Sequence, residues 1–349
     1  MRMRICIKEK NQAKFELIMK THYKILAIIS ALTIAIGANS HLNAQKKKPK
    51  TWENQKAEKL KPLTSEEKEK VGAAIPAAAT AKSKKDRKLL IFYRCGGFIH
   101  TSISAANYAI PEMGKKTGAF TADVSDDYGV FTDENLAKYD AILFNSTTHL
   151  KFPDPKQRAA ILSFIKNGKG VVGIHAAGDC FHNWPEGAAL MGGLFAGHPW
   201  TAGGTWAFRL DDPKHVLNQA FDGKGFWHQD EIYQYKPDTF VGPEKIRILV
   251  SLDMTKKAVS DKVTNEKAQK NKTFPPGVRD VPVSWLREYG KGRLFYTNFG
   301  HNKQTYWAPN VMQHYLDGLQ YAFGDLETDA TPTAKAKKVE PALAPEKAP

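Results

Sequence analysis

Residues 169–178 read KGVVGIHAAG, a compact apolar run followed by small residues around a single histidine. The apolar run is typical of a buried strand, and small neighbours let the backbone turn sharply and expose the central side chain. We therefore predict a strand-to-helix elbow at His175. An imidazole is a poor stable nucleophile but a good proton carrier, so the position favours acid–base chemistry or ligand binding. The alternative is a core histidine that hydrogen-bonds to the backbone.

The sequence before this elbow alternates between apolar runs and helical patterns. Residues 87–94 (RKLLIFYR) and 139–146 (YDAILFNS) each predict a buried strand. A helix is expected over residues 104–116, and a second one begins at Pro155 after the capping residue Asp154. Strands that alternate with helices pair in parallel, so we predict an α/β fold with a doubly wound, mostly parallel sheet in three layers.

The C-terminal part of the body consists of shorter extended segments. Residues 282–289 (PVSWLREY) and 292–300 (GRLFYTNFG) are separated by a glycine–lysine pair, which predicts a β-hairpin. A polar insertion, residues 255–280, precedes this hairpin, and an amphipathic helix over residues 309–323 follows it. No linker interrupts residues 89–330, so we expect one domain with a hairpin-rich C-terminal part.

The distribution of charge argues against nucleic-acid binding by the domain. The formal charge of the chain is +15, a value typical of proteins that bind nucleic acid. Residues 89–330 nevertheless contain 26 basic and 26 acidic side chains, so the excess positive charge lies in the terminal segments. No basic groove is therefore expected on the folded body, and nucleic acid is not a predicted partner.

The sequence that starts at Met19 has the anatomy of a signal peptide. Two lysines precede an apolar run, residues 25–38, and small residues follow it up to Ala44. The run is shorter than the roughly 20 residues that cross a bilayer as a helix, so we expect no stable membrane insertion after cleavage. Residues 1–44 are thus predicted to be a signal peptide that exports the protein to the periplasm or the extracellular space. Translation from Met1 is the alternative to Met19.

Two further segments flank the predicted domain. Residues 45–88 are rich in Lys, Glu, Ala and Pro and contain few large apolar side chains, so we expect a linker or a partly helical arm. Residues 331–349 have the same character and are predicted to be a disordered tail.

Only Cys95 and Cys180 remain after the predicted cleavage. Both follow predicted strands at one edge of the sheet, so we expect them close together as buried free thiols. A disulfide is the alternative, because an oxidising compartment allows one.

Histidines follow several of the predicted strands. His100 lies in the loop after the first strand, His175 forms the elbow, and His301 comes after the strand of the hairpin. Ligands of parallel sheets bind outside the carboxyl ends of the strands, so we expect these side chains to converge there. Trp184 and Tyr233 offer aromatic faces that can stack on a sugar ring, although packing is the commoner role of such residues.

The order of several motifs resembles the ThuA-like (trehalose utilisation) family. Within residues 88–325 the motifs are IFYRCGGFIHTS, GKGVVGIHAAGDCFHNWPE, MGGLFAGHPW, HQDEIYQY and PVSWLREYGKGRLFYTNFGH. The resemblance implies the class I glutamine amidotransferase-like fold, a flavodoxin-like arrangement. It also implies a role in carbohydrate metabolism, with disaccharides such as trehalose or their 3-keto derivatives as substrates.

The resemblance, carried over position by position, implies a set of polar site residues. We expect His175 and Glu231 to be the catalytic acid–base pair. The residues expected to bind or orient the substrate are His100, His198, His301, Asp230 and Tyr233. Trp184 is added to them because it lies directly after the elbow and is expected to line the same mouth. Asp230 and Glu231 are adjacent on an extended segment and should point in opposite directions, which disfavours a glycosidase mechanism that pairs them. The histidines also leave open a divalent metal ion held by separate loops.

Three functions are compatible with these residues. The leading hypothesis is an enzyme that acts on a carbohydrate, in which a His or Glu base removes a proton next to a carbonyl group. The main alternative is a non-catalytic carbohydrate-binding module, which does not require His175 and Glu231 to share one pocket. A cysteine-dependent amidotransferase is disfavoured, because His175 stands where the nucleophilic cysteine is needed. The substrate, the reaction type and the oligomeric state remain open at this point.

Overall fold

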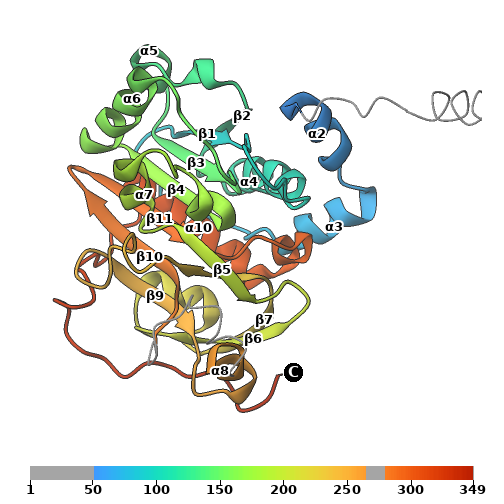
Figure 1. Cartoon of the computed structure of the whole chain (residues 1–349), viewed down its shortest axis with the longest axis vertical. Coiled ribbons are helices and arrows are strands. Elements are labelled where there is room, and N and C mark those ends of the chain that lie inside the picture. Colours follow the sequence, from blue (N-terminus) through green and yellow to red (C-terminus); the bar gives the residue numbers. More distant parts are fainter. Residues whose placement is uncertain (1–50, 265–279, 349) are drawn as a thin grey trace, which may run out of the picture. The chain divides into compact units, whose positions relative to one another are not determined.

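The computed structural model describes residues 51–264 and 280–348 of the 349-residue chain. Its centre is a nine-stranded sheet with the strand order β2-β1-β3-β4-β11-β10-β9-β6-β7 (Figure 1). The strands of the first half are β1 (Lys88–Phe92), β2 (Thr121–Ser125), β3 (Ala141–Asn145), β4 (Gly170–Ile174) and β11 (Gly292–Thr297). Neighbouring strands in this half pair in parallel. The predicted parallel α/β sheet is therefore confirmed.

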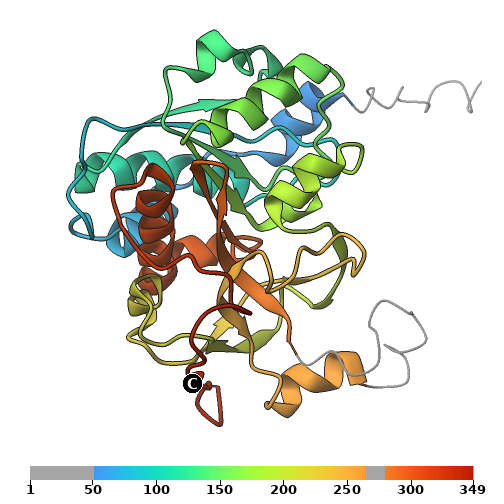
Figure 2. The ribbon, with the colours of Figure 1, turned by 90° about the vertical axis from the view of Figure 1, so that its left-hand side faces the viewer.

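Helices cover both faces of the parallel half. α4 (Ile103–Thr117) and α10 (Pro309–Phe323) lie on one face, whereas α5 (Asp133–Leu136), α6 (Pro155–Lys166) and α7 (Pro185–Met191) lie on the other (Figure 2). Alternate side chains of β1 serve the two cores: Leu89 and Ile91 pack with α4 and α10, and Leu90 and Phe92 pack with α5, α6 and α7. This alternation follows from the period of two in a strand and gives the three predicted layers.

Local sequence signals set the helix boundaries. The carboxylate of Asp154 accepts a hydrogen bond from the backbone of Lys156 at 2.8 Å, and Pro155 opens α6. α4 ends at Gly118, whose φ of 67° lies in the left-handed region that glycine enters without a steric cost.

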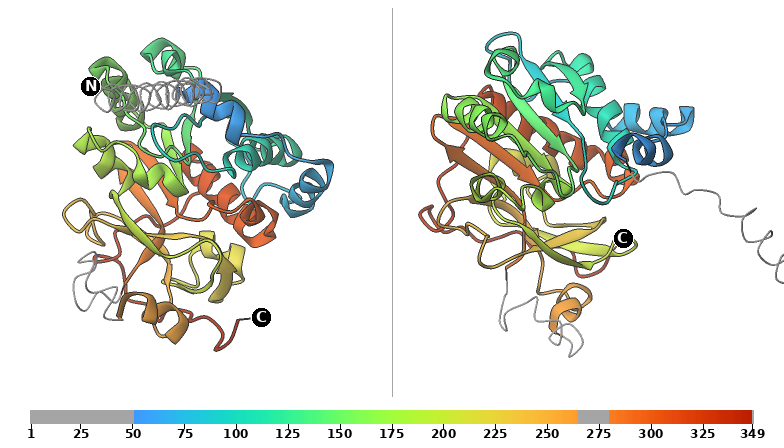
Figure 3. Two further views of the ribbon diagram at one scale, coloured as in Figure 1. Left: turned by 45° about the vertical axis from the view of Figure 1, so that its right-hand side comes forward. Right: turned by 45° about the horizontal axis from the view of Figure 1, so that its top comes forward.

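The second half of the sheet is antiparallel. It contains β6 (Thr205–Leu210), β7 (Phe226–Gln229), β9 (Arg247–Leu252) and β10 (Pro282–Tyr289), which continue the sheet beyond β11 (Figure 3). β10 and β11 form the predicted hairpin, with Gly290 in the turn at φ 64°. β5 (Phe195–Trp200) and β8 (Ile232–Tyr235) form a separate antiparallel pair. α8 (Lys257–Thr264) occupies the start of the predicted polar insertion, and residues 265–279 lie outside the described part of the chain.

Part of the segment expected to be a linker is helical. α2 comprises Trp52–Lys59 and α3 comprises Ser65–Ala74. A capping box opens α3, because the Thr64 hydroxyl accepts from the Glu67 backbone and the Glu67 carboxylate accepts from the Thr64 backbone. Further along, the side-chain oxygen of Gln320 in α10 accepts hydrogen bonds from the backbone of Thr80 and Ala81. Residues 65–81 thus form a partly helical arm, the alternative to a linker, and the end of this arm is hydrogen-bonded to α10.

The C-terminal segment differs from the disorder that its composition predicts. Leu210 of β6 forms a backbone bridge with Ala342. The carboxylate of Asp253 accepts a hydrogen bond from the backbone of Ala344 at 3.0 Å. Composition could not reveal this placement, because the partners of the segment are backbone and carboxylate groups far away in the sequence. Among the described residues no helix is both long and apolar enough to cross a membrane, and the expected signal peptide, residues 1–44, lies outside them.

Candidate functional site

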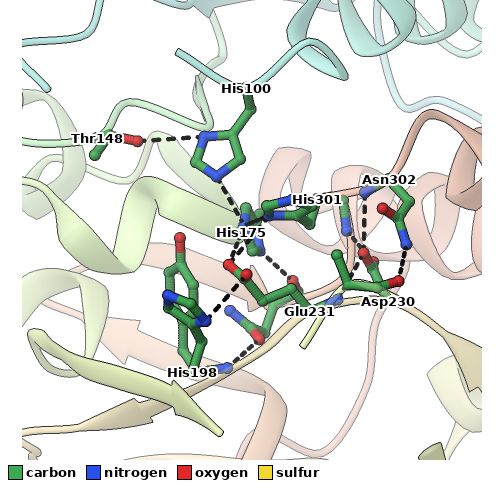
Figure 4. Close-up of polar contacts among 12 residues, drawn as sticks. His100, Thr148, His175, His198, Asp230, Glu231, His301 and Asn302 are labelled. Atoms are coloured by element: carbon green, nitrogen blue, oxygen red, sulfur yellow. Dashed lines mark hydrogen bonds and ion pairs between the residues drawn. The ribbon is translucent and has the colours of Figure 1, made fainter. Parts of the chain in front are cut away.

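Four side chains meet at the carboxyl edge of the parallel strands (Figure 4). His175 follows β4 directly and begins a short 3-10 helix, η2 (His175–Asp179), while His100 lies after β1 and His301 lies after β11. Glu231 comes immediately before β8 and reaches the same point. His100, His175 and His301 therefore converge at this edge of the sheet, as predicted.

His175 is held with one ring nitrogen aimed at the centre of the cluster. Its φ of 48° is rare for a side chain other than glycine and marks the sharp elbow. Its Nδ1 lies 2.9 Å from the backbone oxygen of Asn298, which can only accept, so Nδ1 carries the proton. Nε2 is consequently the bare nitrogen. The elbow analogy predicts an exposed side chain, but His175 is fully buried and contacts both Asn298 and His301.

The contacts around Nε2 of His175 are short. Nε2 of His100 and Nδ1 of His301 each lie 3.2 Å from it. The nearer oxygen of Glu231, Oε1, lies 3.8 Å from the same atom. The expected catalytic pair, His175 and Glu231, therefore shares one site, although a direct hydrogen bond between them would require a shorter distance.

Glu231 links two other histidines through its two oxygens. Oε1 lies 3.1 Å from Nδ1 of His301, and Oε2 lies 3.2 Å from Nδ1 of His198. The carboxylate is 9% exposed, whereas the His198 side chain on β5 is 48% exposed. His198 can therefore exchange protons with solvent and pass them to a carboxylate that solvent hardly reaches.

The environment separates the pKa values of the histidines. Burial, together with the charges of His301 and His198, lowers the pKa of His100 to about 3. Burial and the neighbouring histidines also lower the pKa of His175 well below its usual value. Burial lowers the pKa of His301 too, but its hydrogen bond and ionic attraction to Glu231 outweigh this effect and raise the pKa overall. Near neutral pH, His100 and His175 are thus neutral donors of lone pairs.

The carboxylate of Asp230 points away from the cluster, so the structure does not bring it to the place where the substrate is expected to bind. Its carboxylate accepts hydrogen bonds from the backbone of Gly300 at 2.7 Å and of Asn302 at 3.0 Å. The hydroxyl of Thr305 and the backbone of Glu231 donate to it as well, both at 3.0 Å. Asp230 therefore anchors the segment that positions His301, and the opposite orientations predicted for Asp230 and Glu231 are observed (Figure 4).

The two expected aromatic residues differ in their placement. The Tyr233 ring lies 4.5 Å from the His175 ring, centroid to centroid, and it is buried behind the cluster. Trp184 is buried in the core, where it packs against Phe152 and Phe181. Its position therefore fits a role in packing, not the expected contact with a substrate.

The mouth of the site contains a residue that sequence reasoning missed. Phe98 is 65% exposed, and its ring lies 4.8 Å from that of His100. It lines a pocket of about 250 Å³ together with His100, Thr101, His301, Asn302, Lys303 and Gln304. A large exposed aromatic side chain beside buried histidines suits stacking on an apolar face of a ligand. The only sequence signal is its position two residues before His100, which on a loop does not define a direction.

A second polar group lies at the same edge of the sheet. His149 is 3.4 Å from the carboxylate of Asp179, and His182 is 2.8 Å from it. The backbone of His149 donates to the backbone oxygen of Asp179 at 2.8 Å, which ties the loops after β3 and β4 together. Asp179 is buried and both histidines are more exposed, so this group flanks the main cluster as an outer polar rim.

Neither cysteine in the described part of the chain has the properties of a nucleophile. Cys95 and Cys180 are free and buried thiols. Burial raises the pKa of Cys95 to about 12 and raises that of Cys180 well above its usual value. The buried Cys180 thiol donates to the backbone oxygen of Ala177 at 2.7 Å. Both groups stay protonated near neutral pH, which disfavours cysteine-dependent amidotransferase chemistry.

Comparisons with known proteins agree with the family resemblance. A family model described as ThuA, trehalose utilisation, matches residues 88–322. Among solved structures, a ThuA-like protein from Bacteroides uniformis is 21% identical with a TM-score of 0.51, and the match covers 73% of this chain and 99% of that one. A ThuA-like protein from Parabacteroides merdae is 17% identical with a TM-score of 0.49, covering 73% and 98%. A comparison with curated proteins gives no match.

Proposed function

Because the chain belongs to the ThuA family, whose description is trehalose utilisation, we propose that it is an enzyme of carbohydrate utilisation. The proposed site is the cluster of His100, His175, His301 and Glu231, with His198 beside it. The proposed substrate is a disaccharide or its 3-keto derivative. The observation that carries the proposal is that Glu231 contacts His301 and His198 at 3.1 and 3.2 Å next to a pocket with an exposed aromatic rim.

The arrangement supports proton transfer at a carbon next to a carbonyl group. His198 and Glu231 share a short contact, and His198 reaches solvent, so the pair can take a proton from a substrate and release it. Donors such as the ring of His301 lie close enough to the same carboxylate to stabilise an oxyanion as it forms. Such steps lead to isomerisation, elimination or hydration of a keto-sugar.

A non-catalytic binding module is the second candidate, and Phe98 favours it as much as it favours an enzyme. A binder, however, gains nothing from a carboxylate that faces three imidazoles, because grouping titratable side chains in a buried site has an electrostatic cost. The enzyme is therefore the better account of the centre of the site.

The direct test is turnover of disaccharides and their 3-keto forms by wild type and by Glu231→Gln. We expect wild type to consume at least one of these sugars and the variant to be slower by about a hundredfold or more, since it cannot accept a proton. Glu134→Gln, at an exposed glutamate far from the pocket in sequence, is the matched control and should retain full activity. Sugar binding by wild type without consumption of any member of the panel would establish the binding module instead.

Export is part of the proposal. The signal-like residues 1–44 predict that the enzyme works outside the cytoplasm, where disaccharides first meet the cell. Intact-mass measurement of the exported protein should give an N-terminus near Gln45. An unprocessed N-terminus on protein recovered from the cytoplasm would refute export without affecting the assignment of the site.

A further inference from the structure

The four central side chains present donor atoms of the kinds that borderline divalent metals prefer. Nε2 of His100, Nε2 of His175, Nδ1 of His301 and an oxygen of Glu231 all lie within 4.8 Å of one another. Three imidazole nitrogens with one carboxylate oxygen are typical ligands of Zn²⁺ and of its neighbours in the first transition row.

The separations between these atoms match the edges of a coordination polyhedron. Zn²⁺ bonds of about 2.0–2.1 Å in a tetrahedron place neighbouring ligand atoms about 3.3–3.4 Å apart. The two contacts to Nε2 of His175 are both 3.2 Å, and the contacts of Glu231 Oε1 are 3.1 Å to His301 and 3.8 Å to His175. The observed edges lie on both sides of the tetrahedral value, so small shifts would complete the geometry.

Hydrogen bonds alone explain these contacts less completely. Nε2 of His175 has a single lone pair because its proton is on Nδ1, yet two ring nitrogens lie 3.2 Å from it. If His100 donates its Nε2 hydrogen to this lone pair, His301 donates its Nδ1 hydrogen to Glu231. No hydrogen then lies between Nδ1 of His301 and Nε2 of His175, although these two atoms are 3.2 Å apart. A cation at the centre accounts for every short contact at once.

The second layer of contacts orients the rings as metal-binding histidines are oriented. Nδ1 of His175 donates to the backbone oxygen of Asn298, and Nδ1 of His100 lies 3.3 Å from the hydroxyl of Thr148. Asn298 is fixed in turn, because its backbone donates to Val283 at 2.7 Å and its side-chain oxygen accepts from Tyr233 at 2.8 Å. Such outer partners fix the tautomer and the direction of a ligating ring.

From these observations we infer that His100, His175, His301 and Glu231 bind a borderline divalent cation such as Zn²⁺. The pocket lies beside His100 and His301, so a ligand bound there would reach the cation as a fifth coordinating group. With the cation bound, Glu231 uses one oxygen as a ligand and keeps the other for His198, so the Glu231–His198 pair stays in place for proton transfer. Cation binding stands independently of the proposed carbohydrate activity, because it can be measured without any substrate.

The test measures cation binding by protein first stripped with a chelator and then dialysed. Titration calorimetry with ZnCl₂ should show about one tight equivalent per chain, and CoCl₂ should give visible absorption bands of a low-symmetry site. His301→Gln replaces the most accessible of the four ligands, so it is the variant most certain to fold. Together with Glu231→Gln, it should weaken Zn²⁺ binding by about a hundredfold or more, beyond the 10- to 100-fold typical of outer-shell changes.

Two further variants keep the assignment falsifiable. His198→Ala removes an outer partner of Glu231 that is not among the four ligands, so it should weaken Zn²⁺ binding less than either ligand variant does, by under about a hundredfold. His182→Ala disrupts the outer group of His149, Asp179 and His182, and it should leave the tight equivalent in place. The inference is overturned if stripped wild type binds neither cation tightly, or if His182→Ala abolishes binding that His301→Gln and Glu231→Gln leave intact. Circular dichroism of each variant checks that a loss of binding does not reflect unfolding.

Discussion

Replacement of Asp230 by Asn should destabilise the protein although the two side chains have the same shape. Each carboxylate oxygen of Asp230 accepts two hydrogen bonds: Oδ1 from the backbone of Glu231 and Asn302, and Oδ2 from Gly300 and Thr305. An amide nitrogen cannot accept, so it must face one of these pairs. It will face Gly300 and Thr305, because a hydroxyl can rotate and accept whereas a backbone N–H cannot.

The magnitude of the effect follows from this arrangement. Asp230→Asn leaves the buried N–H of Gly300 without an acceptor, which costs about 1–3 kcal/mol, and it weakens the remaining bonds by removing the charge. We therefore expect a loss of about 2–4 kcal/mol in the free energy of unfolding. Urea denaturation followed by circular dichroism at neutral pH measures it. Asp238→Asn, at an exposed carboxylate, should change stability by less than about 0.5 kcal/mol. Equal stabilities for Asp230→Asn and wild type would refute the anchoring role of Asp230.

Three further predictions concern stability and binding. Burial lowers the pKa of His314 to about 4, whereas the unfolded chain has the usual value of 6.5. The contribution of His314 to the free energy of unfolding is therefore complete above pH 6.5, and up to about 3 kcal/mol of it is lost as the pH falls toward 4. The free energy of unfolding of His314→Gln should depend less on pH across this window. Gly173→Ala would place a methyl group 2.8 Å from the ring of Tyr296, so it should lower the free energy of unfolding by about 1–3 kcal/mol. An unchanged midpoint of urea denaturation would contradict this close packing. Phe98→Ala should leave the melting temperature unchanged but weaken sugar binding about fivefold, which titration calorimetry can measure, and an unaltered affinity would exclude stacking.

The sequence allowed the edge of the sheet to be predicted because strand order and direction obey general rules. His100, His175 and His301 each follow a parallel strand, and parallel strands present their carboxyl ends at one edge. The final helix was predicted at residues 309–323 and observed as α10 over the same residues, because its apolar spacing and Pro309 mark it clearly.

Other parts of the site depend on contacts between distant segments, which a single sequence does not encode locally. His198 lies on β5, whose sequence FAGHPW lacks alternation and contains both Gly and Pro, so no strand was predicted there. The burial of His175 depends on Asn298 and Tyr233, which come more than 50 residues later in the chain. For Trp184 the sequence left a ligand contact open beside the commoner role in packing, and the contact with Phe181 identifies packing.

The most direct test of the central claim is solvent deuterium exchange into a bound 3-keto disaccharide, followed by proton NMR. If the site of Glu231 and His198 removes a proton next to the carbonyl group, wild type in D₂O should exchange that hydrogen or consume the sugar, and Glu231→Gln should do neither at a comparable rate. The prediction applies to protein supplied with Zn²⁺ and to protein treated with chelator, compared side by side. A 3-keto disaccharide that binds to wild type under both conditions without exchange or consumption would contradict the proposal that this protein is an enzyme.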